Sequence, residues 1–103
     1  MDAHISRGDG VVTVSLAGEI DTYTASEVRQ TFDTLSVRAD DEVVVDLGEV
    51  TFLDSTGIGA ILSLHRRVTA AGGRLQLNCS GITLQLMRLM GIDQVIDVVP
   101  IAR

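Results

Sequence analysis

The stretch Val43-Val44-Val45-Asp46-Leu47 decides the fold, because its β-branched apolar residues predict a strand in the middle of a sheet. A strand with so little polar alternation is typical of a parallel sheet covered on both faces. Residues 48–54 then lead to Asp54-Ser55-Thr56-Gly57. A helix over about residues 57–71 follows, and Gly72-Gly73 ends it, as glycines after a helix commonly do. A buried strand connected to a helix is the repeating unit of an α/β fold.

The sequence before this stretch predicts a β-hairpin. Residues 3–7 form a short edge strand, and Gly8-Asp9-Gly10 is a turn because glycine tolerates positive φ. Residues 12–16 alternate apolar and polar side chains, with the period of two that marks a half-buried strand. Gly18-Glu19-Ile20-Asp21 leaves that strand.

A first helix is predicted over about residues 24–38. Thr24, with Glu27 three residues later, fits a capping box at its start. Apolar residues then recur at the spacing of one helical face. These are Val28, Phe32 and Leu35.

The remaining chain predicts strand, helix and strand. Residues 75–79 alternate apolar and polar side chains, Ser80 caps a third helix that Gly91 closes, and residues 95–101 supply the last strand. The order is therefore β-β-α-β-α-β-α-β, and we expect one domain over residues 1–103. Helical crossovers make most of the sheet parallel, and the initial hairpin adds an antiparallel edge strand. The predicted fold class is α/β with a mixed, mostly parallel sheet.

Composition excludes several classes of function. The net charge is −6, with eight arginines and no lysine, whereas binding to nucleic acid draws most of its affinity from basic contacts to phosphate. An anionic membrane surface is disfavoured for the same reason. A Walker A lysine for binding ATP is absent from the chain. His4, His65 and Cys79 have no metal-ligand spacing, so we expect no metal site and no cofactor.

The residues also indicate a cytoplasmic location. Cys79 is the only cysteine, which suits a reducing compartment. No signal peptide is visible at the start of the chain, and no apolar run approaches the ~20 residues of a membrane span. Cys79 itself is expected to be a small core residue.

The segment Asp54-Ser55-Thr56-Gly57 carries the candidate chemistry. A helix begins there, and its unpaired N–H groups and dipole favour a negative charge such as a phosphate. Gly57 and Gly59 have no side chains and would let another protein approach the hydroxyl of Ser55. Taken alone, the tetrapeptide is more simply a helix cap, because Asp, Ser and Thr are preferred at that position.

A longer pattern adds a family resemblance. Gly18-Glu19-Ile20-Asp21 is followed at the usual spacing by Phe52-Leu53-Asp54-Ser55-Thr56-Gly57-Ile58-Gly59. Over about residues 10–101 the chain resembles the STAS domains of bacterial anti-anti-sigma factors, also called anti-sigma factor antagonists. The resemblance implies the STAS fold. Family members usually continue into a C-terminal helix, whereas this chain stops at Arg103, so we expect that helix to be absent or truncated.

The resemblance also implies a switch. In this family the unphosphorylated protein binds an anti-sigma factor, which is a Ser/Thr kinase with a GHKL-type ATP site, and thereby frees the sigma factor. The kinase phosphorylates the serine that matches Ser55, which ends binding, and a phosphatase resets it. The chain would thus not be an enzyme, and ATP would come with the kinase. The matching partner-binding positions are Asp21, Asp54, Ser55, Thr56, Gly57 and Gly59. Thr22 is added to this surface because it adjoins Asp21.

The sequence is also compatible with other functions. A stand-alone STAS domain can serve as a scaffold or nucleotide-binding subunit in a lipid-transport or stress-sensing complex. A response-regulator receiver would use Asp46 as phosphoacceptor but needs a lysine that the chain lacks. Asp46 is more simply a structural residue at a strand end. Asp21 is equally an ordinary helix-entry residue.

Three further side chains carry expectations. His65 falls near the buried stripe of the second helix and is expected to be partly buried. Arg66-Arg67 should form a solvated helix face. Tyr23, next to Thr22, would line the partner surface because of its proximity to Asp21.

Overall fold

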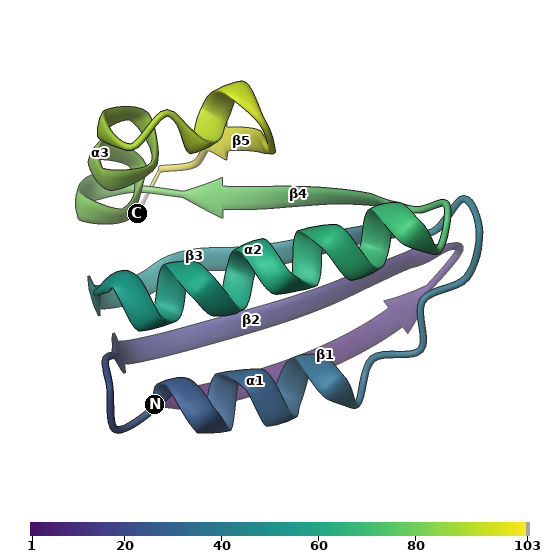
Figure 1. Cartoon of the computed structure of the whole chain (residues 1–103), viewed down its shortest axis with the longest axis horizontal. Coiled ribbons are helices and arrows are strands. Elements are labelled where there is room, and N and C mark those ends of the chain that lie inside the picture. The colour runs from purple at the N-terminus through teal and green to yellow at the C-terminus, as the bar shows by residue number, and fades with distance from the viewer. Residues whose placement is uncertain (103) are drawn as a thin grey trace.

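The computed structural model describes residues 1–102 and shows the predicted order of elements, with one added 3₁₀ turn (Figure 1). The elements are β1 (Asp2–Gly8), β2 (Val11–Ile20), α1 (Ala25–Asp33), β3 (Glu42–Leu53), α2 (Ser55–Ala70), β4 (Arg74–Cys79), α3 (Gly81–Leu89), η1 (Ile92–Gln94) and β5 (Asp97–Pro100).

The strands form one mixed sheet in the order β1-β2-β3-β4-β5. β1 is antiparallel to β2, and every other neighbouring pair is parallel. Asp9 and Gly10 connect β1 to β2 with positive φ angles of 54° and 76°, as a two-residue hairpin turn of type I′ requires. The predicted fold class and the predicted antiparallel edge are confirmed.

Helices α1 and α2 lie side by side over one face of the sheet (Figure 1). This follows from the strand order, because right-handed crossovers that all step in one direction place their helices on one face. The expectation that helices cover both faces of the central strand is corrected. Asp46 lies on the other face, is half-buried, and lines a shallow pocket open to solvent with Ser15 and Ala17.

One continuous hydrophobic core lies between the sheet and the helices. Val12, Val14 and Leu16 contribute from β2, and α2 contributes residues spaced three and four apart, as a helix with one buried face requires. These are Ile58, Ile61, Leu64 and Val68. Within residues 1–102, no helix combines the length and the hydropathy that crossing a membrane requires.

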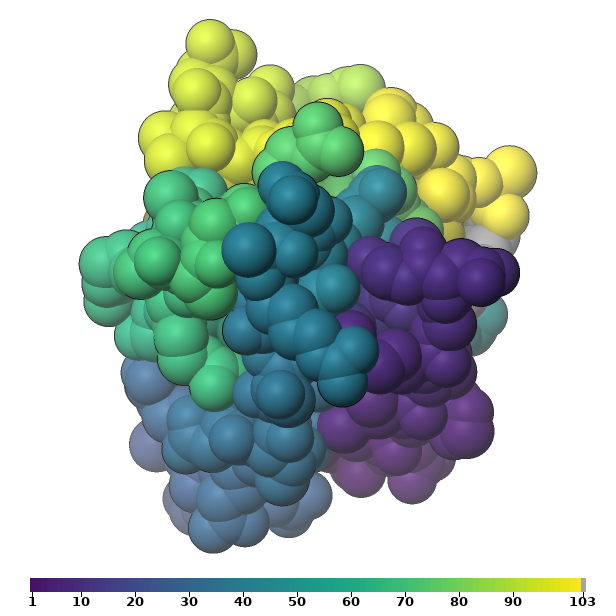
Figure 2. All heavy atoms as spheres, turned by 90° about the vertical axis from the view of Figure 1, so that its right-hand side faces the viewer, coloured from purple at the N-terminus to yellow at the C-terminus, as the bar shows by residue number. Residues whose placement is uncertain are grey.

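The amino ends of the parallel strands are tied together by backbone hydrogen bonds. The N–H of Glu42 donates to the carbonyl of Gly10 at 2.9 Å, and that of Asp40 donates to Gly72 at 3.0 Å. Figure 2 shows this end, where the hairpin turn, the segment before β3 and the end of α2 lie side by side. Ser55 lies at the opposite end, where the carboxyl ends of β2 and β3 meet the start of α2.

Strand β3 is longer than predicted, because residues 48–53 continue it rather than forming a loop. Its register against β2 shifts twice, between Ser15 and Ala17 and between Gly18 and Glu19, and each shift gives β3 one extra residue. The buried positions at this end are consequently spaced by three, at Leu47, Val50 and Leu53. Such bulges break the period of two that identifies a strand in sequence.

Helix boundaries also differ from the expectation. α1 stops at Asp33 instead of residue 38, and α2 begins at Ser55, two residues earlier than predicted. The guanidinium of Arg67 donates to the carbonyls of Phe32 and Leu35 just where α1 ends. Arg67 thus connects α2 to the end of α1, while both Arg66 and Arg67 are exposed, as expected for a solvated helix face.

Two smaller corrections concern the ends of elements. The capping box of Thr24 and Glu27 does not form, because the hydroxyl of Thr24 donates to the carbonyl of Glu19 at 2.9 Å and to the carboxylate of Asp21. The last strand begins at Asp97, since Val95 closes η1. Ser80 is the N-cap of α3, as predicted.

The first turn of α2 packs tightly on the ends of β2 and β3. A Cβ atom on Gly57 would lie 2.5 Å from Cδ1 of Leu53 and 2.7 Å from Cγ2 of Ile20, so only glycine allows this approach. A Cβ atom on Gly59 would meet only Nη2 of Arg29, at 3.3 Å, which is the movable end of an exposed side chain. The two glycines of one helix therefore have different roles.

This difference predicts opposite effects of the same substitution. Gly57→Ala should lower the free energy of unfolding by about 1–3 kcal/mol, because overpacking forces neighbours to move. Gly59→Ala should raise it by about 0.5–1 kcal/mol, because alanine favours a helix over glycine. Urea denaturation followed by circular dichroism measures both. Equal effects of the two substitutions would show that the first turn of α2 is not packed as described.

Candidate functional site

Ser55 is the first residue of α2 and is exposed at its start. Asp54 precedes it in extended conformation as the N-cap, and its Oδ1 accepts hydrogen bonds from the amides of Thr56 at 3.0 Å and Gly57 at 3.3 Å. The hydroxyl of Thr56 donates to the same oxygen. Among residues 1–102, no group forms a hydrogen bond with Ser55 Oγ. The hydroxyl of Thr56 is therefore hydrogen-bonded within the protein, whereas the hydroxyl of Ser55 is not.

The cap also fixes the charge next to Ser55. The hydroxyl of Thr56 holds the pKa of the Asp54 carboxyl below its ordinary value, although partial burial acts in the opposite direction. The amides of Gly57 and Thr56 and the side chain of Thr22 add to the lowering of this pKa. Asp54 is therefore a carboxylate at neutral pH, and it lies directly beside the available hydroxyl.

The loop after β2 lies against this junction. Ile20 pairs with Leu53 at the ends of two parallel strands, and the amide of Asp54 donates to the carbonyl of Ile20 at 3.2 Å. The side chain of Thr22 lies close enough to the Asp54 carboxyl to contribute to the lowering of its pKa. Parallel pairing thus brings together two motifs that are more than thirty residues apart in sequence, as the resemblance implied.

Asp21 organises its own loop. Its Oδ1 accepts hydrogen bonds from the amides of Tyr23 at 2.9 Å and Thr24 at 3.0 Å. The interpretation of Asp21 as a helix-entry residue is therefore correct, and its carboxylate has a structural task in the free protein. The loop that it holds leaves the neighbouring Tyr23 almost fully exposed, at 88%.

The predicted partner-binding residues gather at one end of the molecule but differ in exposure. Ser55 and Thr22 are exposed, and Asp21, Asp54, Thr56 and Gly59 are half-buried. Gly57 is buried under Ile20 and Leu53, so its lack of a side chain serves packing inside the protein. The expectation that Gly57 makes room for an approaching protein is corrected.

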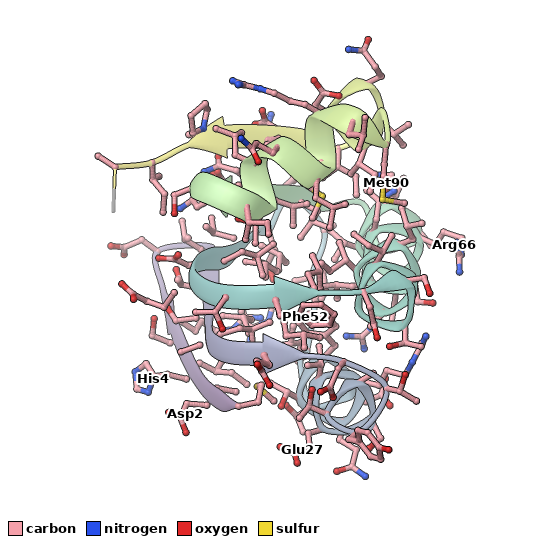
Figure 3. All side chains as sticks on the ribbon, turned by 90° about the vertical axis from the view of Figure 1, so that its left-hand side faces the viewer. Asp2, His4, Glu27, Phe52, Arg66 and Met90 are labelled. Carbon is pink, nitrogen blue, oxygen red and sulfur yellow. The ribbon has the colours of Figure 1, made fainter. Side chains whose placement is uncertain are left out.

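Two residues of this end escaped the sequence reasoning. Phe52 is 46% exposed at the end of β3, and Figure 3 shows it at the centre of the face that carries the carboxyl ends of the strands. Its side chain points away from the face that buries the neighbouring Leu53, whereas a large apolar residue in an apolar segment is ordinarily expected in the core. Arg29 lies over Gly59, and nothing in the sequence distinguishes it from other arginines on exposed helix positions.

Other candidate residues lie away from this junction. Asp46 is in the interior of β3 rather than at its end, and it accepts a hydrogen bond from the amide of Gly48 at 2.8 Å. Cys79 is buried as expected, and burial raises the pKa of its thiol to about 11, so it stays protonated. His65 is half-buried, which confirms its expected position. The part of the chain that the structure describes contains no cluster of His, Cys, Asp and Glu suited to a metal ion.

Comparison with known proteins identifies the family. The family model described as "Mlab, STAS domain" matches residues 3–100. The anti-sigma-B factor antagonist of Bacillus subtilis (strain 168) is 29% identical over 99 residues, which cover 95% of this chain and 90% of that protein. The anti-sigma-B factor antagonist of Listeria monocytogenes is 31% identical over 90 residues, which cover 87% of this chain and 77% of that protein.

A solved structure agrees with these relatives. The crystal structure of an anti-sigma factor antagonist from Mycobacterium paratuberculosis matches with a TM-score of 0.87 and 27% sequence identity, covering 97% of this chain and 86% of that one. The fold, the family model and the sequence relatives therefore agree, and this chain belongs to the STAS domain family.

Proposed function

We propose that this chain is a cytoplasmic anti-sigma factor antagonist that is switched off by phosphorylation of Ser55. The observation that carries the proposal is the junction of β3 and α2, where the Ser55 hydroxyl is exposed and unused. The relatives named as anti-sigma factor antagonists support it. In this role the protein acts by binding rather than by catalysis, and an anti-sigma factor kinase of GHKL type supplies the ATP.

The geometry favours Ser55 over Thr56 as the phosphate acceptor. Transfer requires the acceptor hydroxyl to give up its proton as its oxygen bonds to the γ-phosphorus of ATP and the bond to ADP breaks. Thr56 is half-buried and its hydroxyl donates to Asp54, so phosphorylation of Thr56 would remove one of the three hydrogen bonds that Asp54 accepts at the start of α2. Ser55 can react without losing any hydrogen bond within the protein.

The partner surface surrounds this hydroxyl. Ser55 and Thr22 are its exposed members, and half-buried Asp21, Asp54, Thr56 and Gly59 shape it. Gly57 is buried beneath this surface and contributes indirectly, because it sets how closely α2 approaches the strand ends. A phosphatase that resets Ser55 would need to reach the same exposed position.

Phosphorylation would end binding through local electrostatics. A phosphate adds about −1.5 to −2 charges at pH 7, next to the carboxylate of Asp54. An uncompensated charge buried in an interface costs about 3–5 kcal/mol, and each 1.4 kcal/mol is about tenfold in affinity. A loss of at least about a hundredfold in affinity therefore needs no large rearrangement of the fold.

The acceptor assignment predicts a specific labelling pattern. When the protein is incubated with an anti-sigma factor kinase and ATP, mass spectrometry should place one phosphate on Ser55. Ser55→Ala should abolish its incorporation. Thr56→Val, the matched change at the neighbouring hydroxyl, should leave Ser55 as the labelled residue, although it weakens the helix cap. Phosphate on Thr56 in the unaltered protein would contradict the assignment.

A second candidate function is a binding subunit in a transport or stress-sensing complex. The observation that favours it is the description of the matching family model, "Mlab, STAS domain". Affinity purification from the native bacterium distinguishes the two functions, because an ATP-binding-cassette subunit in place of a GHKL-type kinase would favour the second candidate. A role as a response-regulator receiver is disfavoured, since Asp46 lies inside β3 and not at a strand end.

A further inference from the structure

We propose that Arg29 on α1 is the intramolecular partner of the phosphate on Ser55, and that it holds the phosphate in a fixed position across the two helices. This inference rests on the proposed phosphorylation of Ser55 and names the residue that receives the modified side chain. It assigns a task to a basic residue that neither the family resemblance nor the sequence pattern singles out.

The first support is distance. Ser55 and Gly59 are four residues apart on α2 and so share a face, with Cβ positions about 5–6 Å apart. A Cβ atom on Gly59 would lie 3.3 Å from Nη2 of Arg29. The guanidinium nitrogen is therefore within about 9 Å of Ser55 Cβ.

The second support is that the guanidinium can move to the phosphate. A phosphoryl oxygen lies three covalent bonds beyond Cβ, and a contact between guanidinium N–H and a phosphate oxygen spans about 2.7–2.9 Å. Rotation about the terminal torsions of an exposed Arg29 covers what remains of the distance. Because Gly59 has no side chain, no atom of that residue blocks the path along α2.

The third support is that Arg29 has no other task. Of the three arginines on α1 and α2, Arg67 donates to two backbone carbonyls and Arg66 donates to the hydroxyl of Ser63 at 3.1 Å. Arg29 has no hydrogen bond or ion pair with any residue from 1 to 102, although Asp33 lines the same groove between the helices. The planar guanidinium group of Arg29 can donate to two oxygens of a phosphate at once.

The charges that face the phosphate make this pairing measurable. Asp54 and Asp21 lie at the strand ends beside Ser55, so their carboxylates repel the phosphate. Asp33, at the far end of α1, lies in the groove with Ser63 and Arg67 instead. Arg29, next to Gly59, is the cation that the distances above bring within reach of the phosphate. Its positive charge should lower the second pKa of the phosphate, which the surrounding carboxylates alone would raise.

The test is a phosphorus NMR titration of the 103-residue chain carrying phosphoserine at position 55. The residue is introduced during synthesis, so no kinase is needed. Arg29→Gln should raise the second pKa of the phosphate by at least about 0.5 unit, because an opposite charge is removed. Arg29→Lys keeps the positive charge but loses the bidentate guanidinium contact, so it should raise the phosphate pKa less. Arg66→Gln, the matched control on α2, should leave the pKa unchanged.

An equal phosphate pKa in the unaltered protein and in Arg29→Gln would overturn the inference. A change of the same size in Arg66→Gln would also overturn it, because the effect would then reflect net charge alone. Circular dichroism of each variant shows that the fold is kept, as expected for exposed positions. Since the titration needs no kinase, failure of the inference is separate from failure of the proposed function, which the labelling experiment tests.

Discussion

The close approach of α2 to the ends of β2 and β3 is the constraint on which the site depends. Gly57 allows it by presenting no side chain to Ile20 and Leu53, and the amide of Asp54 is bonded to the carbonyl of Ile20. Because the two strands are parallel, their carboxyl ends deliver two loops to the same place. One loop carries Thr22 and the other carries Asp54, and the side chain of Thr22 helps to lower the pKa of the Asp54 carboxyl.

The cap of α2 separates two adjacent hydroxyls that the sequence alone treats alike. Asp54 takes the amides of the first turn and the hydroxyl of Thr56, which leaves Ser55 as the side chain that projects freely. The same interactions keep Asp54 ionised. A helix cap and a candidate modification site are thus the same structure, and the sequence could not choose between them because both use the same residues.

Much of the fold could be predicted because its signals are local. The turn at Asp9–Gly10, the strand alternation over residues 12–16 and the glycines after α2 each act within a few residues. The errors arose where distant residues decide. The bulged end of β3 follows from its register with β2, and the early end of α1 coincides with carbonyl contacts from Arg67, which lies on α2.

The same distinction between local and distant determinants applies to the site. Ser55 and Asp54 were found because the motif keeps them at fixed spacing, and Thr22 because it adjoins Asp21. The position of Arg29 over Gly59 depends instead on how α1 and α2 pack, and no pattern within either helix reports this.

The most direct test of the central claim compares the affinity of one anti-sigma factor kinase for two forms of this protein. Isothermal titration calorimetry would use the unmodified chain and the chain with phosphoserine at position 55, in the absence of ATP. The account predicts that the unmodified form binds and that the phosphorylated form binds at least about a hundredfold more weakly. Equal affinity of the two forms would contradict it.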